Sequence, residues 1–214
     1  VMRKLVPVAV ALIMSLGAHA QESETVLYER LGSMASEVIS EYLNGPLCSP
    51  GPDLAKKQVE LAKLVSQATP GTGPMVMEFA VMANSLSDLQ RLHDGGEVQP
   101  GPWGTLLHLA ATYGSPTMLE YLVNEGFGLE DVGEATTIPA LGIAVTAGNI
   151  ENTKWLIANG ANVNATDTSG GSVIHHSLVC KDQALVDLLL EAGAIPDGRA
   201  REAAQRLGMS LVLD

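Results

Sequence analysis

The stretch Thr105-Leu-Leu-His-Leu-Ala110, followed by Gly114, by Leu122-Val123 and by Gly126, decides the fold because the chain repeats its pattern twice. One copy follows at a constant offset of 34 positions, and a looser copy lies a further 33 positions along the chain. The matching positions are Leu141, Ala144, Gly148, Leu156-Ile157 and Gly160, and then Ile174, Ser177, Lys181, Leu189-Leu190 and Gly193. A sequence that repeats itself at such a period indicates stacked repeat units.

Each copy predicts a short inner helix followed by an outer helix. Small residues such as Ala110 and Ala144 allow the inner helices to pack closely, while the aliphatic pairs give each outer helix one apolar face. Gly126, Gly160 and Gly193 come just after the outer helices, where a left-handed residue lets the chain turn. Neither helix can bury its apolar face alone, so stacking of the units must supply the core.

This pattern resembles the ankyrin repeat, which includes the sequence T-P-L-H-x-A. The resemblance implies an all-α fold, a solenoid of helix-turn-helix units that binds other proteins. His108 and His175 occupy the histidine of that pattern, where the family uses side-chain to backbone hydrogen bonds to brace the loops. Gly142 replaces this histidine in the middle repeat, so the resemblance does not carry the brace there.

The same pattern extends in both directions. A degenerate copy lies 30 positions before the first clear one, with Asn84 in place of a glycine. After the last copy, Asp197 is placed to cap an amphipathic helix. We therefore assign 71–214 to the repeat array, with repeats at about 75–100, 104–137, 138–171 and 172–196 and a C-terminal capping helix at 197–208.

Residues 21–70 depart from the repeat pattern and are expected to form an N-terminal helical cap. Apolar residues recur at helical spacing from Glu24 to Leu43, and Asn44-Gly45-Pro46 stops the run. A second helix is predicted from about Asp53 to Ser66. These helices either shield the first repeat from water, which is the simpler interpretation, or form part of the binding surface.

The first twenty residues have the pattern of a signal peptide. Arg3 and Lys4 precede a 12-residue run from Leu5 to Leu16, and Ala18-His-Ala20 forms an A-x-A cleavage site. The run is shorter than the roughly 20 residues that a membrane-spanning helix needs. We therefore expect residues 1–20 to be removed, and the product to be a soluble exported protein of the periplasm without a membrane anchor.

The charge of the chain narrows the class of partner. Removal of the signal peptide takes two of the 12 basic residues and none of the 24 acidic ones, and 10 minus 24 leaves a net charge of −14. Such a surface repels nucleic acid phosphates and anionic lipids and favours basic proteins. The alternative is that the acidity only keeps an exported protein in solution.

Cys48 and Cys180 allow two interpretations. Export would bring both thiols into an oxidising compartment, where an even number of cysteines tends to pair. In a linear stack, however, Cys48 lies in the helical cap and Cys180 at the end of the last inner helix. That arrangement separates them beyond the roughly 7 Å between α-carbons that a disulfide can span. We favour two separate thiols, with the bridge as the alternative.

Few residues suggest catalysis. His176 and Cys180 are spaced i, i+4 and could form half of a metal site or a thiolate and imidazolium pair, but nothing supplies the rest. The chain has no P-loop, nucleophile elbow or dinucleotide-binding glycine pattern. The acidic cluster Glu130, Asp131 and Glu134 lacks the spacing of an EF-hand. We therefore expect a non-enzymatic protein without cofactor or metal.

The resemblance also places the candidate binding residues. In ankyrin-like proteins the connections between repeats project as fingers beside a concave face, and two variable positions near the end of each inner helix face that groove. Tyr113 is the preferred anchor because a tyrosine offers a large contact area at little entropic cost, and Trp103 is the second choice. The full set is Trp103, Thr112, Tyr113, Glu130, Asp131, Glu134, Thr146, Thr166, Asp167 and Thr168, with Ala147, Val179 and Cys180 at the remaining groove positions.

Among exported bacterial proteins with similar repeats, one recurrent role is immunity, in which the protein neutralises an antibacterial effector delivered by a type VI secretion system. The resemblance therefore implies a protein that occludes the active site of its partner. We expect it to be monomeric when free. The alternative role is a scaffold in the cell envelope that protects against oxidative stress beside a periplasmic catalase.

Overall fold

The computed structural model of the chain describes residues 22–44, 48–69, 74–93, 106–132 and 137–212. In these ranges the regular structure consists of eleven α-helices and one short 3₁₀ helix, and the only β contact is an isolated bridge between Thr166 and Ser172. The prediction of an all-α fold is therefore confirmed. No helix in the described part of the chain is long and apolar enough to cross a membrane. The expected signal peptide lies outside the described residues.

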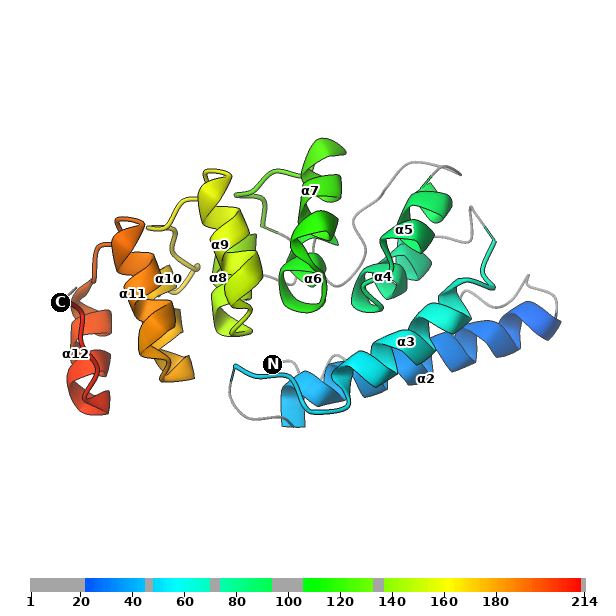
Figure 1. Cartoon of the computed structure of the whole chain (residues 1–214), viewed down its shortest axis with the longest axis horizontal. Helices are drawn as coiled ribbons and strands as arrows, with labels where there is room; N and C mark the ends of the chain where they lie inside the picture. Colours follow the sequence, from blue (N-terminus) through cyan, green and yellow to red (C-terminus); the bar gives the residue numbers. More distant parts are fainter. Residues whose placement is uncertain (1–21, 45–47, 70–73, 94–105, 133–136, 213–214) are drawn as a thin grey trace. The chain divides into compact units, whose positions relative to one another are not determined.

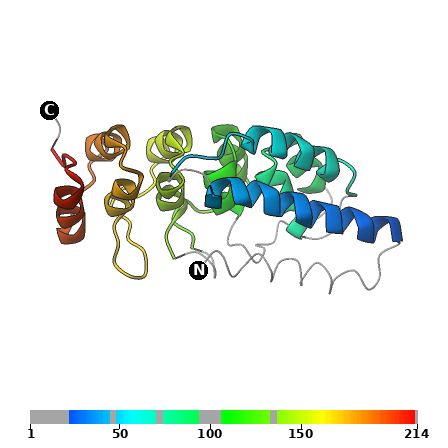
Figure 2. The ribbon, with the colours of Figure 1, turned by 90° about the horizontal axis from the view of Figure 1, so that it is seen from below.

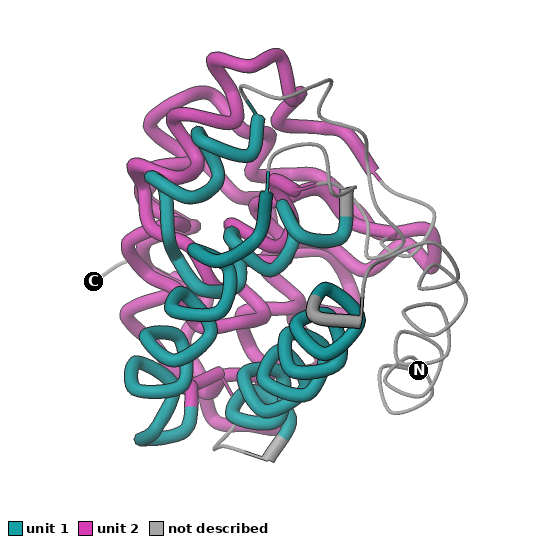
Figure 3. The backbone as a smooth tube through the Cα atoms, turned by 90° about the vertical axis from the view of Figure 1, so that its right-hand side faces the viewer, with its two compact units in different colours: residues 1–45, 51–99 teal, residues 46–50, 100–214 magenta. Residues whose placement is uncertain are grey.

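The chain forms two compact units (Figure 3). The first comprises residues 1–45 and 51–99, and the second comprises residues 46–50 and 100–214. The helices of the degenerate repeat thus belong to the same unit as the helices of the N-terminal cap. The contacts explain this grouping, because the inner helix of that repeat packs on both helices of the cap.

Four helices build the first unit, namely α2 (Glu22–Asn44), α3 (Leu54–Val65), α4 (Pro74–Met82) and α5 (Leu86–His93). The first two match the predicted helices closely. Their facing sides bury Leu31, Val38 and Leu61. The guanidinium of Arg91 donates hydrogen bonds of 2.6 Å to the Ala68 carbonyl and 3.1 Å to the Val65 carbonyl. A cation is favourable near the C-terminal end of a helix such as α3. The Val65 carbonyl also accepts a 3.0 Å bond from the Ala68 N–H.

The second unit stacks helical hairpins in a row (Figure 1). The hairpins pair α6 (Leu106–Tyr113) with α7 (Pro116–Asn124), α8 (Ala140–Thr146) with α9 (Ile150–Ala158), and α10 (Val173–Ser177) and η3 (Leu178–Cys180) with α11 (Gln183–Glu191). The inner helices α6, α8 and α10 pack on one another, and α12 (Gly198–Leu207) closes the row by packing on α10 and η3. Asp197 caps α12 by accepting a 2.7 Å hydrogen bond from the Ala200 N–H, as predicted.

The glycines that follow the outer helices adopt the backbone conformation that the pattern predicts. Gly126, Gly160 and Gly193 have φ angles of 97°, 91° and 90°, so each outer helix ends in a left-handed residue. Asn84 and Lys181 stand where Gly148 stands in the middle repeat, and their φ values of 52° and 53° lie near its value of 67°. The degenerate positions therefore keep the backbone turn even where the glycine is lost.

The bracing histidine is present in one repeat and replaced in the next. His108 is 2% exposed, and its Nε2 lies 3.0 Å from the Ile138 carbonyl oxygen of the following loop, which confirms the predicted brace. At Gly142 any side chain would overlap Ile138, so an apolar contact occupies the space of the missing imidazole. His175 makes no such brace through Nδ1, which is buried without a hydrogen-bond partner.

Candidate partner-binding surface

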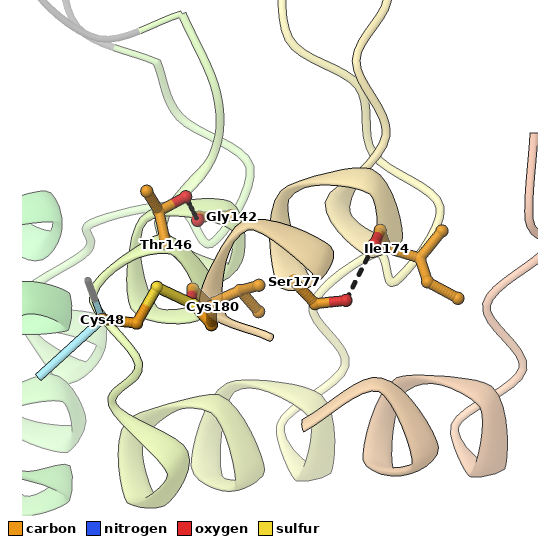
Figure 4. The surroundings of a disulfide bond; sticks show 7 residues. Cys48, Gly142, Thr146, Ile174, Ser177 and Cys180 are labelled. Atoms are coloured by element: carbon orange, nitrogen blue, oxygen red, sulfur yellow. Dashed lines mark hydrogen bonds between the residues drawn. A yellow bond between two sulfur atoms is a disulfide. The ribbon is translucent and has the colours of Figure 1, made fainter. Parts of the chain in front are cut away.

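A disulfide joins Cys48 to Cys180 across a sequence separation of 132, with their α-carbons 5.2 Å apart (Figure 4). The prediction that the stack keeps these cysteines apart is therefore wrong. It assumed that Cys48 stays with the helical cap, whereas residues 46–50 leave α2 and belong to the second unit. The oxidised pair also removes the alternative of a thiolate and imidazolium pair with His176.

The Cys48 segment covers the ends of two inner helices. Gly148 follows α8, and a side chain there would overlap the carbonyl and Cβ of Cys48. The Sγ of Cys180, at the end of η3, lies 3.3 Å from the Val145 carbonyl oxygen of α8. The chain's own segment therefore lies beside two pairs of predicted groove positions, 146–147 and 179–180 (Figure 4).

The predicted groove residues differ in how much surface they offer. Thr146 is exposed and Val179 is 43% exposed, so both present surface to solvent. Thr112 is half-buried, and its hydroxyl donates a 3.2 Å hydrogen bond to the His108 carbonyl within the same helix. Tyr113 is only 8% exposed. Its ring, at the end of α6, therefore offers little surface to a partner, which makes Tyr113 a weaker anchor than the sequence suggested.

The finger at 166–172 is a hairpin organised by Asp167, and Figure 2 shows this connection, drawn in yellow, projecting from the helices. Asp167 Oδ1 accepts hydrogen bonds of 2.8 Å from the N–H groups of Ser169 and Gly171. Its Oδ2 lies 3.0 Å from His176 Nε2. The Ser169 hydroxyl bond, the two backbone N–H bonds and the nearby imidazole lower the pKa of Asp167 to about 2. Because this carboxylate is bonded within the finger, we assign Asp167 a structural role.

Thr166 and Thr168 flank that carboxylate and remain exposed. The hairpin therefore presents two hydroxyl-bearing side chains on a backbone that is fixed from within. Rigid loops of this kind lose little entropy when they bind, so the two threonines are the stronger candidates of this finger.

The acidic finger also uses its carboxylates within the chain. Glu130 Oε1 accepts a 2.8 Å hydrogen bond from the Asn162 N–H, which belongs to the next repeat. Asn164 Oδ1 accepts a bond of the same length from the Ile195 N–H, one repeat further on. Glu130 and Asn164 therefore occupy the same position in successive repeats, and the side chain at this position links its unit to the next one. Asp131 Oδ2 accepts a 2.8 Å bond from the Gly128 N–H.

Exposure nevertheless leaves part of the acidic finger available to a partner. Glu130 and Asp131 are exposed, and the neighbouring Val132 is 56% exposed. Val132 was not among the predicted residues, because an isolated valine in a loop carries no periodic signal. Trp103 and Glu134 lie outside the described residues, so their predicted roles are carried by the sequence alone.

The described residues contain no cluster of three or more His, Cys, Asp or Glu side chains that could hold a metal ion. The groups brought together on this surface are hydroxyls, carboxylates engaged with backbone amides, and small apolar side chains. This arrangement suits contact with another macromolecule.

A family model of ankyrin repeats matches residues 77–167 and 107–200, in three copies. Together these matches run from 77 to 200, which is more than half of the 214 residues. The matched range includes the hairpins and the left-handed glycines described above. The chain belongs to the ankyrin-repeat family, and its repeats form a protein–protein interaction module.

Proposed function

We propose that the protein is an exported binding module of the bacterial periplasm that acts as an immunity protein. In this role it neutralises an antibacterial effector, delivered by a type VI secretion system, by covering the effector's active site. The signal-peptide pattern of residues 1–20 supports export. The Cys48–Cys180 disulfide supports an oxidising compartment, because such bonds persist there and are rare in the cytosol.

One observation carries the steric mechanism. Thr146 is exposed at the end of an inner helix, and Thr166 and Thr168 are exposed on a finger whose backbone is fixed by internal hydrogen bonds. A surface that is rigid before binding can occlude an active site without first being ordered. The excess of acidic residues favours an effector with a basic surface.

Co-expression tests the role directly. Each neighbouring gene is expressed in the periplasm of a sensitive host, with and without this protein, and survival is measured. We expect one neighbour to be toxic alone and harmless in the presence of this protein. If no neighbour is toxic, or if the protein protects against none of them, the immunity role is wrong.

Arginine substitutions test the surface. Thr146→Arg and Thr168→Arg place a bulky cation on the inner-helix end and on the finger, and we expect each to weaken capture of the effector at least about tenfold. Thr117→Arg is the matched control, because Thr117 is exposed on the outer helix α7. Equal capture by all three variants would show that the partner binds elsewhere.

A further inference from the structure

The segment around Cys48 connects the two units of the chain in an unusual way. The chain leaves the first unit after residue 45, contributes residues 46–50 to the second unit, and returns to the first unit at residue 51. The disulfide fixes this excursion to Cys180. The short connection between α2 and α3 is thereby bonded covalently to the repeat array.

Hydrogen bonds do not hold the described part of this segment to the repeats. No hydrogen bond joins residues 48–50 to any described residue of the repeats. Ser49 and Pro50 are exposed. Cys48 approaches the repeat array closely, where the absence of a side chain at Gly148 makes room for its backbone. In the described part of the chain, the disulfide therefore attaches the segment to the repeats without a hydrogen bond beside it.

The backbone at Cys48 favours release once the bond is broken. Cys48 has a φ of 57°. Residues other than glycine occupy this left-handed region at a cost. Cys48 gains conformational freedom if it no longer has to reach Cys180.

We propose that the Cys48–Cys180 disulfide is a redox-released clasp over the end of α8. While it is oxidised, the backbone of Cys48 lies against Gly148, whereas Thr146 and Val179 stay exposed. When it is reduced, the segment leaves and the surface at Gly148 becomes accessible as well. This would regulate the binding face of the proposed function and rests on it for its biological role, but the clasp can be tested without a partner.

The chemistry is thiol–disulfide exchange with a dithiol reductant. A thiolate of the dithiol attacks one sulfur of the cystine, and the other cysteine leaves as a thiolate and takes up a proton. The second thiol of the reductant then resolves the mixed disulfide, releasing the first cysteine. Two electrons pass from the dithiol, which ends as a disulfide, to the cystine, which ends as two thiols. Both cysteines are partly exposed, so the attacking thiolate has access to the bond.

Hydrogen exchange tests the clasp on the full chain, with dithiothreitol as the reductant. On reduction we expect amide exchange to rise roughly tenfold or more in the segment 48–53 and to rise at the end of α8, while the helical circular dichroism signal stays constant. The double variant Cys48→Ser, Cys180→Ser should match the reduced protein and should not respond to dithiothreitol. Complete reduction without a change in exchange, or with loss of the helical signal, would overturn the proposal.

A second experiment tests whether the segment is seated at Gly148. The Gly148→Ala variant introduces a methyl group that overlaps Cys48, and we expect the equilibrium constant for forming the disulfide in a glutathione buffer to fall at least about tenfold. Gly160→Ala is the matched control, because Gly160 has a φ of +91° and no atoms within 4 Å of the added group. Equal constants for the two variants would refute the seating of Cys48 on α8.

Discussion

The buried amide of Asn152 gives the sharpest test of how neighbouring repeats are held together. Asn152, on the outer helix α9, is 0% exposed. Its Nδ2 donates hydrogen bonds of 2.9 Å, 3.2 Å and 3.1 Å to the carbonyls of Ala110, Ala111 and Gly114, at the end of the inner helix α6 of the preceding repeat. One side chain therefore bonds three carbonyls at the end of α6, of which the Ala110 carbonyl also accepts a 2.9 Å bond from the Gly114 N–H.

We expect Asn152→Ala to destabilise the protein by about 2 kcal/mol, because the two N–H protons of the amide are shared among the three carbonyls and each lost hydrogen bond contributes about 1 kcal/mol net. For a chain of this length that corresponds to a fall in melting temperature of roughly 4–8 °C. Asn152→Asp should be more damaging, because it places a negative charge against the same three carbonyls. The measurement is urea unfolding followed by circular dichroism, which gives the free energy of unfolding of each variant.

Asn159→Ala is the control for this experiment. Asn159 ends the same helix, but it is exposed and its Nδ2 makes a single hydrogen bond of 2.8 Å to the Trp155 carbonyl. Its loss should cost less than about 1 kcal/mol. If Asn152→Ala costs no more than Asn159→Ala, the amide does not couple the repeats and this explanation of their stacking is wrong.

Three further predictions concern the finger and loop contacts. The pKa of Asp167 is lowered from 3.8 to about 2, so the contribution of its carboxylate to stability is complete above about pH 4 and is lost as the pH falls toward 2. In acid unfolding, the stabilities of wild type and Asp167→Asn should therefore converge at the low end of this pH range. Burial lowers the pKa of His108 below 6.5, so at mildly acidic pH the unfolded chain binds a proton at this residue more readily than the folded chain does. The stability of the wild type should therefore fall as the pH drops below about 6.5, and the stability of His108→Gln should fall less. Glu130→Ala should lower the free energy of unfolding by about 1 kcal/mol through loss of the bond to the Asn162 N–H, whereas Glu130→Gln should retain most of it, in the same urea assay.

Periodicity predicted those parts of the fold that depend on local spacing. The left-handed turns at Gly126 and Gly160 and the cap at Asp197 follow from residues close together in the sequence, and each was confirmed. These features arise from backbone sterics and from hydrogen bonds that reach only a few residues, so the sequence pattern contains their cause.

The errors in the candidate site concern contacts between distant parts of the chain. The stop signal Asn44-Gly45-Pro46 predicted where α2 ends, but nothing in it indicates that the following residues join the repeats and bring Cys48 to Cys180. The burial of Tyr113 depends in the same way on what surrounds α6 in three dimensions. Repeat patterns define which positions are variable, and the remainder of the chain decides which of those stay exposed.

Glu130 shows that a position can serve two purposes. Its place in the acidic cluster suggested a partner-binding carboxylate, whereas its place in the repeat makes it the acceptor for the Asn162 N–H. Charge reversal at this residue would therefore lower stability as well as change the surface charge. Substitutions at Thr146 or Thr168 separate these effects better.

The links from Glu130 to Asn162 and from Asn164 to Ile195 have a consequence for how such a protein can change over evolutionary time. Each unit supplies a side-chain acceptor to the next unit, and its own main-chain N–H is bonded by the acceptor of the preceding unit. A duplication or deletion of one whole period therefore leaves every junction matched. A gain or loss of any other length would put an unmatched residue opposite a main-chain amide. Descendants of this gene should therefore differ in length by whole multiples of one repeat.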